Sequence, residues 1–148
     1  LATSSAASDV YKRQELTVLF DGGCPLCVRE VTFLRGRDRR DALGFVDIDA
    51  LDYDPESHQG ISYEEAMGRI HAITASGDVV RDVAVFREAY RLIGLGWLYA
   101  PTRWPVVSAV VDWLYGIWAA RRLQLTRRPD LSSLCDERQR CRLETRSR

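Results

Sequence analysis

The stretch Leu16–Arg35, LTVLFDGGCPLCVREVTFLR, decides the expected fold because it joins a strand, a tight turn and a helix. Its first five residues, LTVLF, are apolar or β-branched and predict a buried strand. Residues 21–23, DGG, end that strand with two glycines, which can adopt backbone angles that other residues avoid. The pattern after them has helical spacing, and its apolar stripe consists of Cys27, Val31 and Leu34.

Two cysteines lie where this turn meets the helix. Cys24 is expected at the helix N-terminus, where free backbone N–H groups and the positive end of the helix dipole stabilise a thiolate. Cys27 follows one helical turn later, which brings the two sulfur atoms together. Pro25 fits the first helical position because a proline there gives up no hydrogen bond. The pattern is typical of a redox dithiol in which Cys24, expected to be the more exposed sulfur, attacks a disulfide and Cys27 resolves the mixed disulfide.

Asp21 precedes Cys24 by three positions and has two interpretations. An aspartate in a turn commonly accepts hydrogen bonds from nearby backbone N–H groups, which would make it a structural cap. Alternatively, its carboxylate accepts or supplies a proton during exchange, so it joins Cys24 and Cys27 as a candidate catalytic residue. A nearby negative charge raises the pKa of a thiol, so Asp21 would oppose thiolate formation by Cys24. Three further residues are expected to support the turn: Gly22, Gly23 and Pro25.

The chain up to residue 95 alternates strands with helices. A strand at 43–48 completes a β-α-β unit, whose strands are parallel and whose crossover is right-handed. Residues 70–80, IHAITASGDVV, predict a β-hairpin. Helices are expected at 63–67 and 83–93, with Ser62 and Asp82 as their N-caps. The predicted fold is therefore α/β, with the order β-α-β-α-β-β-α, a mixed four-stranded sheet and an additional C-terminal helix.

That additional helix is predicted to begin at Pro105 and to end near Leu123, after an aromatic linker. Ser108 and Asp112 interrupt its apolar run, which is short for a membrane span. We expect it to pack on the domain with the tryptophans beneath it, and a helix lying at a membrane surface is the weaker alternative. The apolar stripe expected to face the domain is Val106, Val110, Trp113, Leu114 and Ile117.

Four segments follow from these patterns. Residues 1–14 lack periodicity and are expected to be a non-native or disordered start, and residues 15–95 form the α/β domain. Residues 96–125 hold the aromatic linker and the long helix, and residues 126–148 are an arginine-rich tail. From Arg121 onward nine arginines accompany four acidic residues, although the whole chain has no net charge. No nucleic-acid-binding motif accompanies this excess, so nucleic acid is not an expected partner.

Composition and cysteine usage limit the class of protein. The chain has 148 residues, of which 46% are hydrophobic and 28% charged, as in an ordinary soluble domain. No basic start leads into an apolar run, so a cytoplasmic location is expected. In that compartment a CxxC pair beside a β-α-β unit is normally catalytic or metal-binding rather than a structural bridge. We expect no cofactor, and the oligomeric state is not set by the sequence.

The sequence DGGCPLC after a strand resembles the DCC family of predicted thiol-disulfide oxidoreductases, whose Asp-Cys-Cys signature is matched by Asp21, Cys24 and Cys27. The resemblance extends through FVDID, the hairpin and AVFREAYRLIG to about residue 143. It implies a thioredoxin-like fold and thiol-disulfide oxidoreductase activity on a protein or small-molecule thiol or disulfide. Thioredoxins and glutaredoxins place a cis-proline just before the third strand. Residues 63–70 contain no proline, so a conventional substrate groove is not expected.

A second cysteine pair, Cys135 and Cys141, lies in the tail. Late cysteine pairs resemble a feature of the same family, which suggests a second redox pair that exchanges with Cys24 and Cys27. A structural disulfide that fastens the tail is another interpretation. The third is a zinc ion held by all four thiolates, although the spacing of the second pair is wider than tetrahedral cysteine sites usually have. The alternative to an enzyme is therefore a zinc-binding or partner-binding module.

Overall fold

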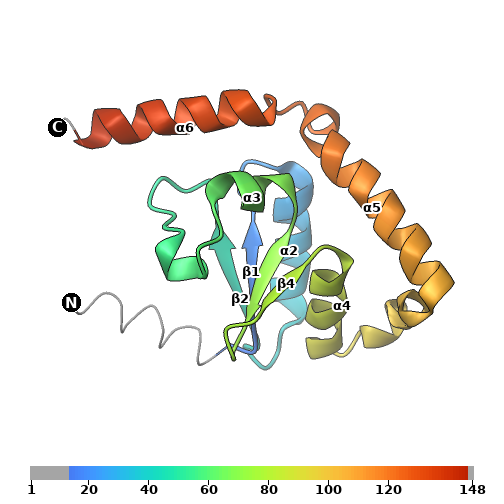
Figure 1. Cartoon of the computed structure of the whole chain (residues 1–148). Coiled ribbons are helices and arrows are strands. Elements are labelled where there is room, and N and C mark those ends of the chain that lie inside the picture. The colour runs from blue at the N-terminus through green and yellow to red at the C-terminus, as the bar shows by residue number, and fades with distance from the viewer. Residues whose placement is uncertain (1–13, 147–148) are drawn as a thin grey trace.

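The computed structural model describes the backbone of residues 14–146 and the side chains of residues 14–139. Its four strands form one mixed sheet in the order β2-β1-β3-β4 (Figure 1). β1 (Leu16–Phe20) pairs in parallel with β2 (Leu43–Asp47) and antiparallel with β3 (His71–Thr74). β4 (Val79–Arg81) forms the hairpin with β3. The mixed sheet and its thioredoxin-like order are confirmed.

Three helices connect or follow these strands near their expected positions: α2 (Pro25–Arg37), α3 (Tyr63–Gly68) and α4 (Val83–Leu92). Ser62 caps α3 as predicted. Its hydroxyl accepts a hydrogen bond from the Glu65 N–H at 3.1 Å, and the Glu65 carboxylate accepts one from the Ser62 N–H at 3.0 Å. This reciprocal capping box satisfies two backbone donors that the short helix leaves unpaired.

Asp82 precedes α4, but its side chain does not cap the helix. Its carboxylate instead accepts a hydrogen bond from Nε of Arg69 at 2.9 Å, and a second Arg69 nitrogen lies 2.8 Å from its other oxygen. Asp82 is therefore the N-cap residue by position, as predicted, but it makes no capping hydrogen bond. An arginine thirteen residues earlier in the chain competes for the carboxylate, which spacing within the helix does not reveal.

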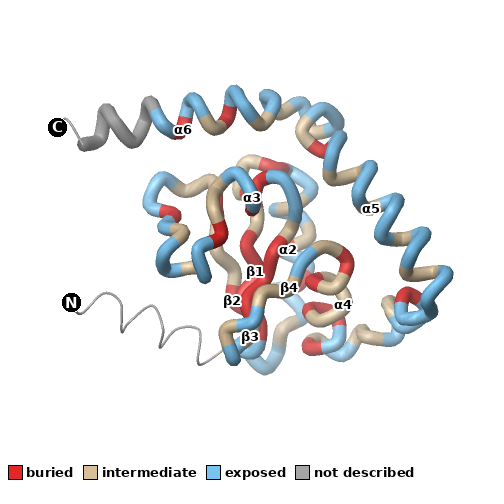
Figure 2. Tube along the Cα trace, in the orientation of Figure 1, coloured by how far each residue is buried: buried red, intermediate tan, exposed pale blue. Residues whose placement is uncertain are grey.

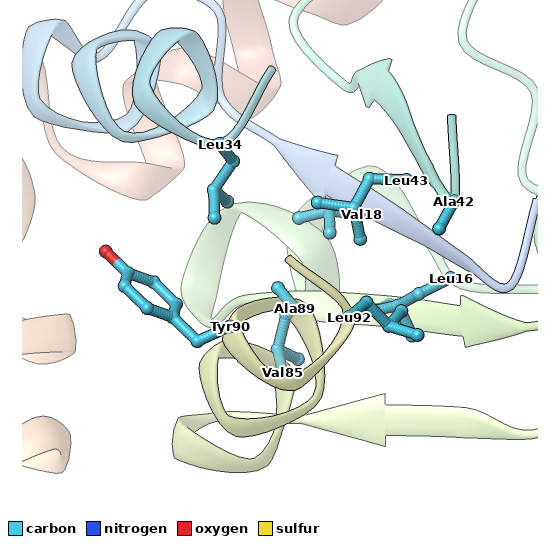
Figure 3. Close-up of a cluster of buried hydrophobic side chains, with 10 residues drawn as sticks. Leu16, Val18, Leu34, Ala42, Leu43, Val85, Ala89, Tyr90 and Leu92 are labelled. Carbon is cyan, nitrogen blue, oxygen red and sulfur yellow. The ribbon is translucent and has the colours of Figure 1, made fainter. Parts of the chain in front are cut away.

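The strand β1 supplies side chains to hydrophobic clusters on both faces of the sheet. Leu16 and Val18 belong to a cluster that includes Leu34 of α2 and Val85 of α4. Figure 3 shows this cluster between the two helices and the sheet. Leu19 points to the other face, because side chains alternate along a strand, and packs in a cluster with α3. Helices α2 and α4 thus cover one face, while α3 covers the other.

The long helix α5 (Pro105–Leu125) does not bury the stripe predicted to face the domain. Figure 2 shows α5 as mostly exposed. The five side chains of that stripe are between 38% and 78% exposed, so the expected packing is wrong. The tryptophans at 97, 104 and 113 are also exposed and form no core beneath the helix. The residues of α5 that turn inward include Tyr115, Trp118 and Arg122, and Leu123 near its end packs against the cluster around α3.

The arginine-rich tail forms a further helix, α6 (Leu131–Arg146), which the sequence pattern did not predict. Leu134 is its buried apolar contact, packed with the cluster around α3. Arg138 lies over the Tyr63 ring, 4.2 Å from its centroid, and donates to the Ala50 carbonyl at 2.6 Å. Helices α5 and α6 run along the outside of the domain (Figure 1), and we call these two helices together the arm. No helix within residues 14–146 is both long and apolar enough to cross a membrane.

Candidate active site

The turn after β1 needs its two glycines because other side chains approach them closely. A Cβ atom on Gly22 would collide with the Asp47 carboxylate, which accepts the Gly22 N–H at 2.8 Å. A Cβ atom on Gly23 would collide with the guanidinium of Arg128. Neither glycine has a positive φ, so the expectation that they adopt unusual backbone angles is wrong. Glycine is needed at both positions because neighbouring side chains leave no room for a Cβ atom.

Cys24 is the N-cap residue of α2, directly before Pro25, as predicted. Its sulfur accepts the Cys27 N–H at 3.4 Å and a hydrogen bond from the Cys27 thiol. These hydrogen bonds favour the charged form, the thiol bond most strongly, and the pKa of Cys24 falls to about 6. The Cys27 thiol donates to its neighbour and lies beside its charge, so the pKa of Cys27 is raised. The two thiols therefore differ in acidity in the direction expected.

Their exposure is the reverse of the prediction. Cys24 is 0% exposed, whereas Cys27 is only partly buried. The Arg128 guanidinium, which follows α5, reaches back to Gly23 and the neighbouring turn. The sequence could not reveal this contact with the turn because Arg128 is more than a hundred residues from the cysteines. The acidic thiol is therefore closed to solvent in this conformation.

Asp21 is buried at the end of β1 and does cap the turn. Its Oδ1 atom accepts the Gly23 N–H at 2.9 Å and an Arg128 N–H at 3.2 Å. The Oδ2 atom is buried without a hydrogen-bond partner. Burial raises the pKa of this carboxyl group, and Arg128 partly opposes that rise. The Asp21 charge also raises the pKa of Cys24, which has the predicted sign.

Arg122 is a second arginine beside the dithiol, and it is 5% exposed. Its Nη1 atom donates to Sγ of Cys27 at 3.6 Å, and its Nη2 atom donates to the Met67 carbonyl. The positive charge lowers the pKa of both thiols. The sequence contained one weak signal for this role: Arg122 continues the helical spacing of Tyr115 and Trp118, so it lies on the same face of α5.

Comparison with known proteins agrees with this geometry. The sequence model of the DCC1-like thiol-disulfide oxidoreductase family matches residues 18–128, which include the dithiol turn and Arg122. The chain belongs to this family. Cys24 and Cys27, which lie close together, therefore belong to the part of the chain that the DCC1-like family model matches.

An Arabidopsis thaliana protein described as uncharacterised and chloroplastic is 42% identical to this chain over 132 residues. The match covers 88% of this DCC1-like chain and 62% of the plant protein, so the chain spans less than two thirds of that relative. No solved structure matches the chain.

The second cysteine pair of this DCC1-like protein is only half described. Cys135 is a free, partly buried thiol on α6, and burial raises its pKa. The Cys141 side chain lies outside the described residues, so the predicted second redox pair and the structural disulfide stay predictions. Among the side chains of residues 14–139, no three His, Cys, Asp or Glu residues gather as they would around a metal ion.

Proposed function

We propose that this protein catalyses thiol-disulfide exchange through Cys24 and Cys27. In the first step the Cys24 thiolate attacks one sulfur of a substrate disulfide. A bond forms between the two sulfurs, the substrate S–S bond breaks, and the leaving sulfur departs as a thiolate that takes up a proton. One observation carries the proposal: Cys24 is the N-cap of α2 and its sulfur accepts the Cys27 N–H at 3.4 Å. This position stabilises a thiolate and agrees with the lowered pKa of Cys24.

In the second step the Cys27 thiol loses its proton to solvent, and the resulting thiolate attacks the Cys24 sulfur of the mixed disulfide. The Cys24 charge and its hydrogen bond raise the pKa of Cys27, and both vanish once Cys24 is bound to the substrate. Arg122, whose Nη1 atom lies 3.6 Å from the Cys27 sulfur in this structure, favours the Cys27 thiolate. The new Cys24–Cys27 disulfide releases the second substrate thiolate, so two electrons pass from the protein to the substrate. The reverse sequence oxidises a substrate dithiol.

A redox titration in glutathione buffers tests the proposal, with thiol trapping and intact-mass detection at each potential. We expect Cys24 and Cys27 to be oxidised together as one two-electron pair, unaffected by a chelator. Cys27→Ser should accumulate a mixed disulfide with glutathione on Cys24, because nothing remains to resolve it. Cys24→Ser should lose turnover, because the first attacking sulfur is absent.

Cys135→Ser is the matched control, since it removes a partly buried thiol elsewhere. It should leave the potential and the trapped adduct unchanged, whereas a relay through Cys135 would alter the number of oxidised thiols. Thiols that react only after metal is removed, with loss of the fold, would contradict an oxidoreductase and favour a metal-held module. We also propose that the protein is located in the cytoplasm. Imaging of a tagged full-length protein in cells tests this location.

A further inference from the structure

An apolar pocket of about 500 Å³ opens beside the dithiol, between α2, α4 and the inward face of α5. Cys27, Asp21 and Arg122 lie on its wall, so one part of the pocket carries the sulfur and the charged groups. The rest is lined mainly by hydrophobic and aromatic side chains, among them Phe33, Phe86 and Trp118. A cavity of this size and composition, with a few convergent polar groups, suits one small molecule.

The backbone beside the pocket offers little to a peptide. An extended peptide would bind by hydrogen bonds to free main-chain groups next to the dithiol. The N–H of Ile70, which precedes β3 and lines the pocket, already donates to the Tyr115 hydroxyl of α5 at 3.1 Å. The Cys27 N–H is likewise directed at the Cys24 sulfur. These donors are occupied, whereas the apolar walls are open.

We propose that the substrate is a small-molecule disulfide, or the corresponding thiol, whose sulfur carries an apolar chain or ring that fills this pocket. This assignment rests on the proposed function. The sulfur end lies beside Cys27 on the pocket wall. Cys24 does not line the pocket, so the local opening that exposes its sulfur precedes the first attack. The apolar part is removed from water against Phe33 and the other walls. The exchange steps are those already given, with two electrons passing between the protein dithiol and the substrate.

A series of alkyl 2-hydroxyethyl disulfides tests the pocket, with methyl, butyl and hexyl chains on one sulfur. Each buried methylene contributes a transfer free energy that corresponds to roughly a threefold gain or more in kcat/KM. We expect kcat/KM for reduction by the wild-type protein to rise from methyl to hexyl. The hexyl 2-hydroxyethyl thioether, which cannot exchange, should bind in a calorimetric titration and inhibit hexyl disulfide reduction competitively.

Two phenylalanines provide a matched pair of variants. Phe33 lines the pocket and has Arg37 over its ring at 4.7 Å, whereas Phe45 has Arg35 at 5.0 Å and lies outside the pocket. Phe33→Asn should flatten the chain-length series, because the contact with the chain is lost. Phe45→Asn should keep the slope of the series.

The outcomes separate the two proposals. Exchange at one rate for every chain length overturns the pocket assignment and leaves the proposed function standing. Faster reduction of a disulfide-bonded polypeptide such as insulin than of the hexyl disulfide also overturns it, in favour of a protein substrate. If the thioether binds while no disulfide is exchanged, the proposed function fails and the substrate assignment fails with it.

Discussion

The acidity of Cys24 arises from its position in the chain and from its neighbour. The Cys27 thiol donates to the Cys24 sulfur and the N-cap position directs the Cys27 N–H at it, so the pKa falls to about 6. Burial of the thiol opposes this shift, and the Asp21 charge adds to that opposition, because a second negative charge beside the thiolate is unfavourable. At the residue scale the site is therefore a balance between hydrogen-bond donors on one side and burial with one carboxyl group on the other.

This balance predicts the pH dependence of Cys24 modification by iodoacetamide. Only the thiolate reacts, so the rate should be half-maximal near pH 6 and about tenfold higher at pH 7 than at pH 5. The measurement is the rate of mass increase in Cys27→Ala and Cys135→Ser backgrounds as well as in the wild-type protein. A Cys27→Ala profile shifted to higher pH is expected, because alanine lacks a donor to the Cys24 sulfur, whereas serine keeps a hydroxyl that can donate. A wild-type rate that still rises tenfold per pH unit above about pH 7 would mean an ordinary thiol.

The two glycines of the turn should respond differently to an added methyl group. Gly22→Ala meets the short Asp47 carboxylate, which has no room to withdraw without losing its hydrogen bond to the turn. We expect Gly22→Ala to lower the free energy of unfolding by about 1–3 kcal/mol. Gly23→Ala meets the far end of the flexible Arg128 side chain and should cost less. Chemical denaturation of both variants checks the order, and equal losses would contradict the collision with Asp47.

At the scale of elements, the connection between α5 and α6 carries the arginine that reaches the dithiol turn. Arg128 pairs with Asp21 at 3.2 Å and with Asp49 at 3.3 Å, which ties this connection to the ends of β1 and β2. The sulfur of Cys24 is fully buried, so a substrate reaches it only after a local opening. The arm formed by α5 and α6 therefore bears on access to the cysteine as well as on its charge.

Replacing Arg128 should make the Cys24 sulfur more accessible to reagents. Arg128→Gln removes both ion pairs, and a loss of about 1 kcal/mol from the closed form would raise the alkylation rate of Cys24 about fivefold. The rate is measured near pH 8, where Cys24 is already a thiolate, so a change in its pKa does not affect the result. Arg121→Gln is the control, because Arg121 is exposed on α5. No acceleration in Arg128→Gln would show that another part of the chain closes the site.

At the scale of the whole molecule, α5 and α6 run along the outside of a compact sheet-and-helix domain (Figure 1). Tyr115 and Arg122 attach α5 through polar contacts and Leu123 packs against the cluster around α3, while Leu134 and Arg138 attach α6. The apolar stripe predicted to hold α5 on the domain faces outward instead. Attachment of the arm therefore depends on these few inward residues.

Substitutions on the arm should show that its buried residues contribute to stability and that its exposed apolar stripe does not. Leu134→Ala removes a buried side chain, so α6 should detach more often and its amides should exchange hydrogen faster while the sheet stays protected. Trp113→Ser removes a larger side chain that is 66% exposed and should change the free energy of unfolding by no more than about 0.5 kcal/mol. Hydrogen exchange followed by mass spectrometry checks both. A large loss of stability in Trp113→Ser would mean that this stripe is buried in solution.

The sequence by itself determined the α/β order, the capped α3 and the dithiol at the start of α2. These features depend on local patterns: alternation of side chains in strands, helical spacing, and residues that suit turns and caps. It also predicted which thiol is the more acidic, because the N-cap position is set by residues 21–27 alone.

Only the tertiary structure decided which residues surround that dithiol. Arg122 and Arg128 come from the far end of the chain, and their contacts with Cys27 and Asp21 follow from the way α5 crosses the domain. The burial of Cys24, the outward apolar stripe and the helical tail have the same origin. Each depends on which surfaces meet in space, and a pattern read along one segment contains no information about a partner a hundred residues away.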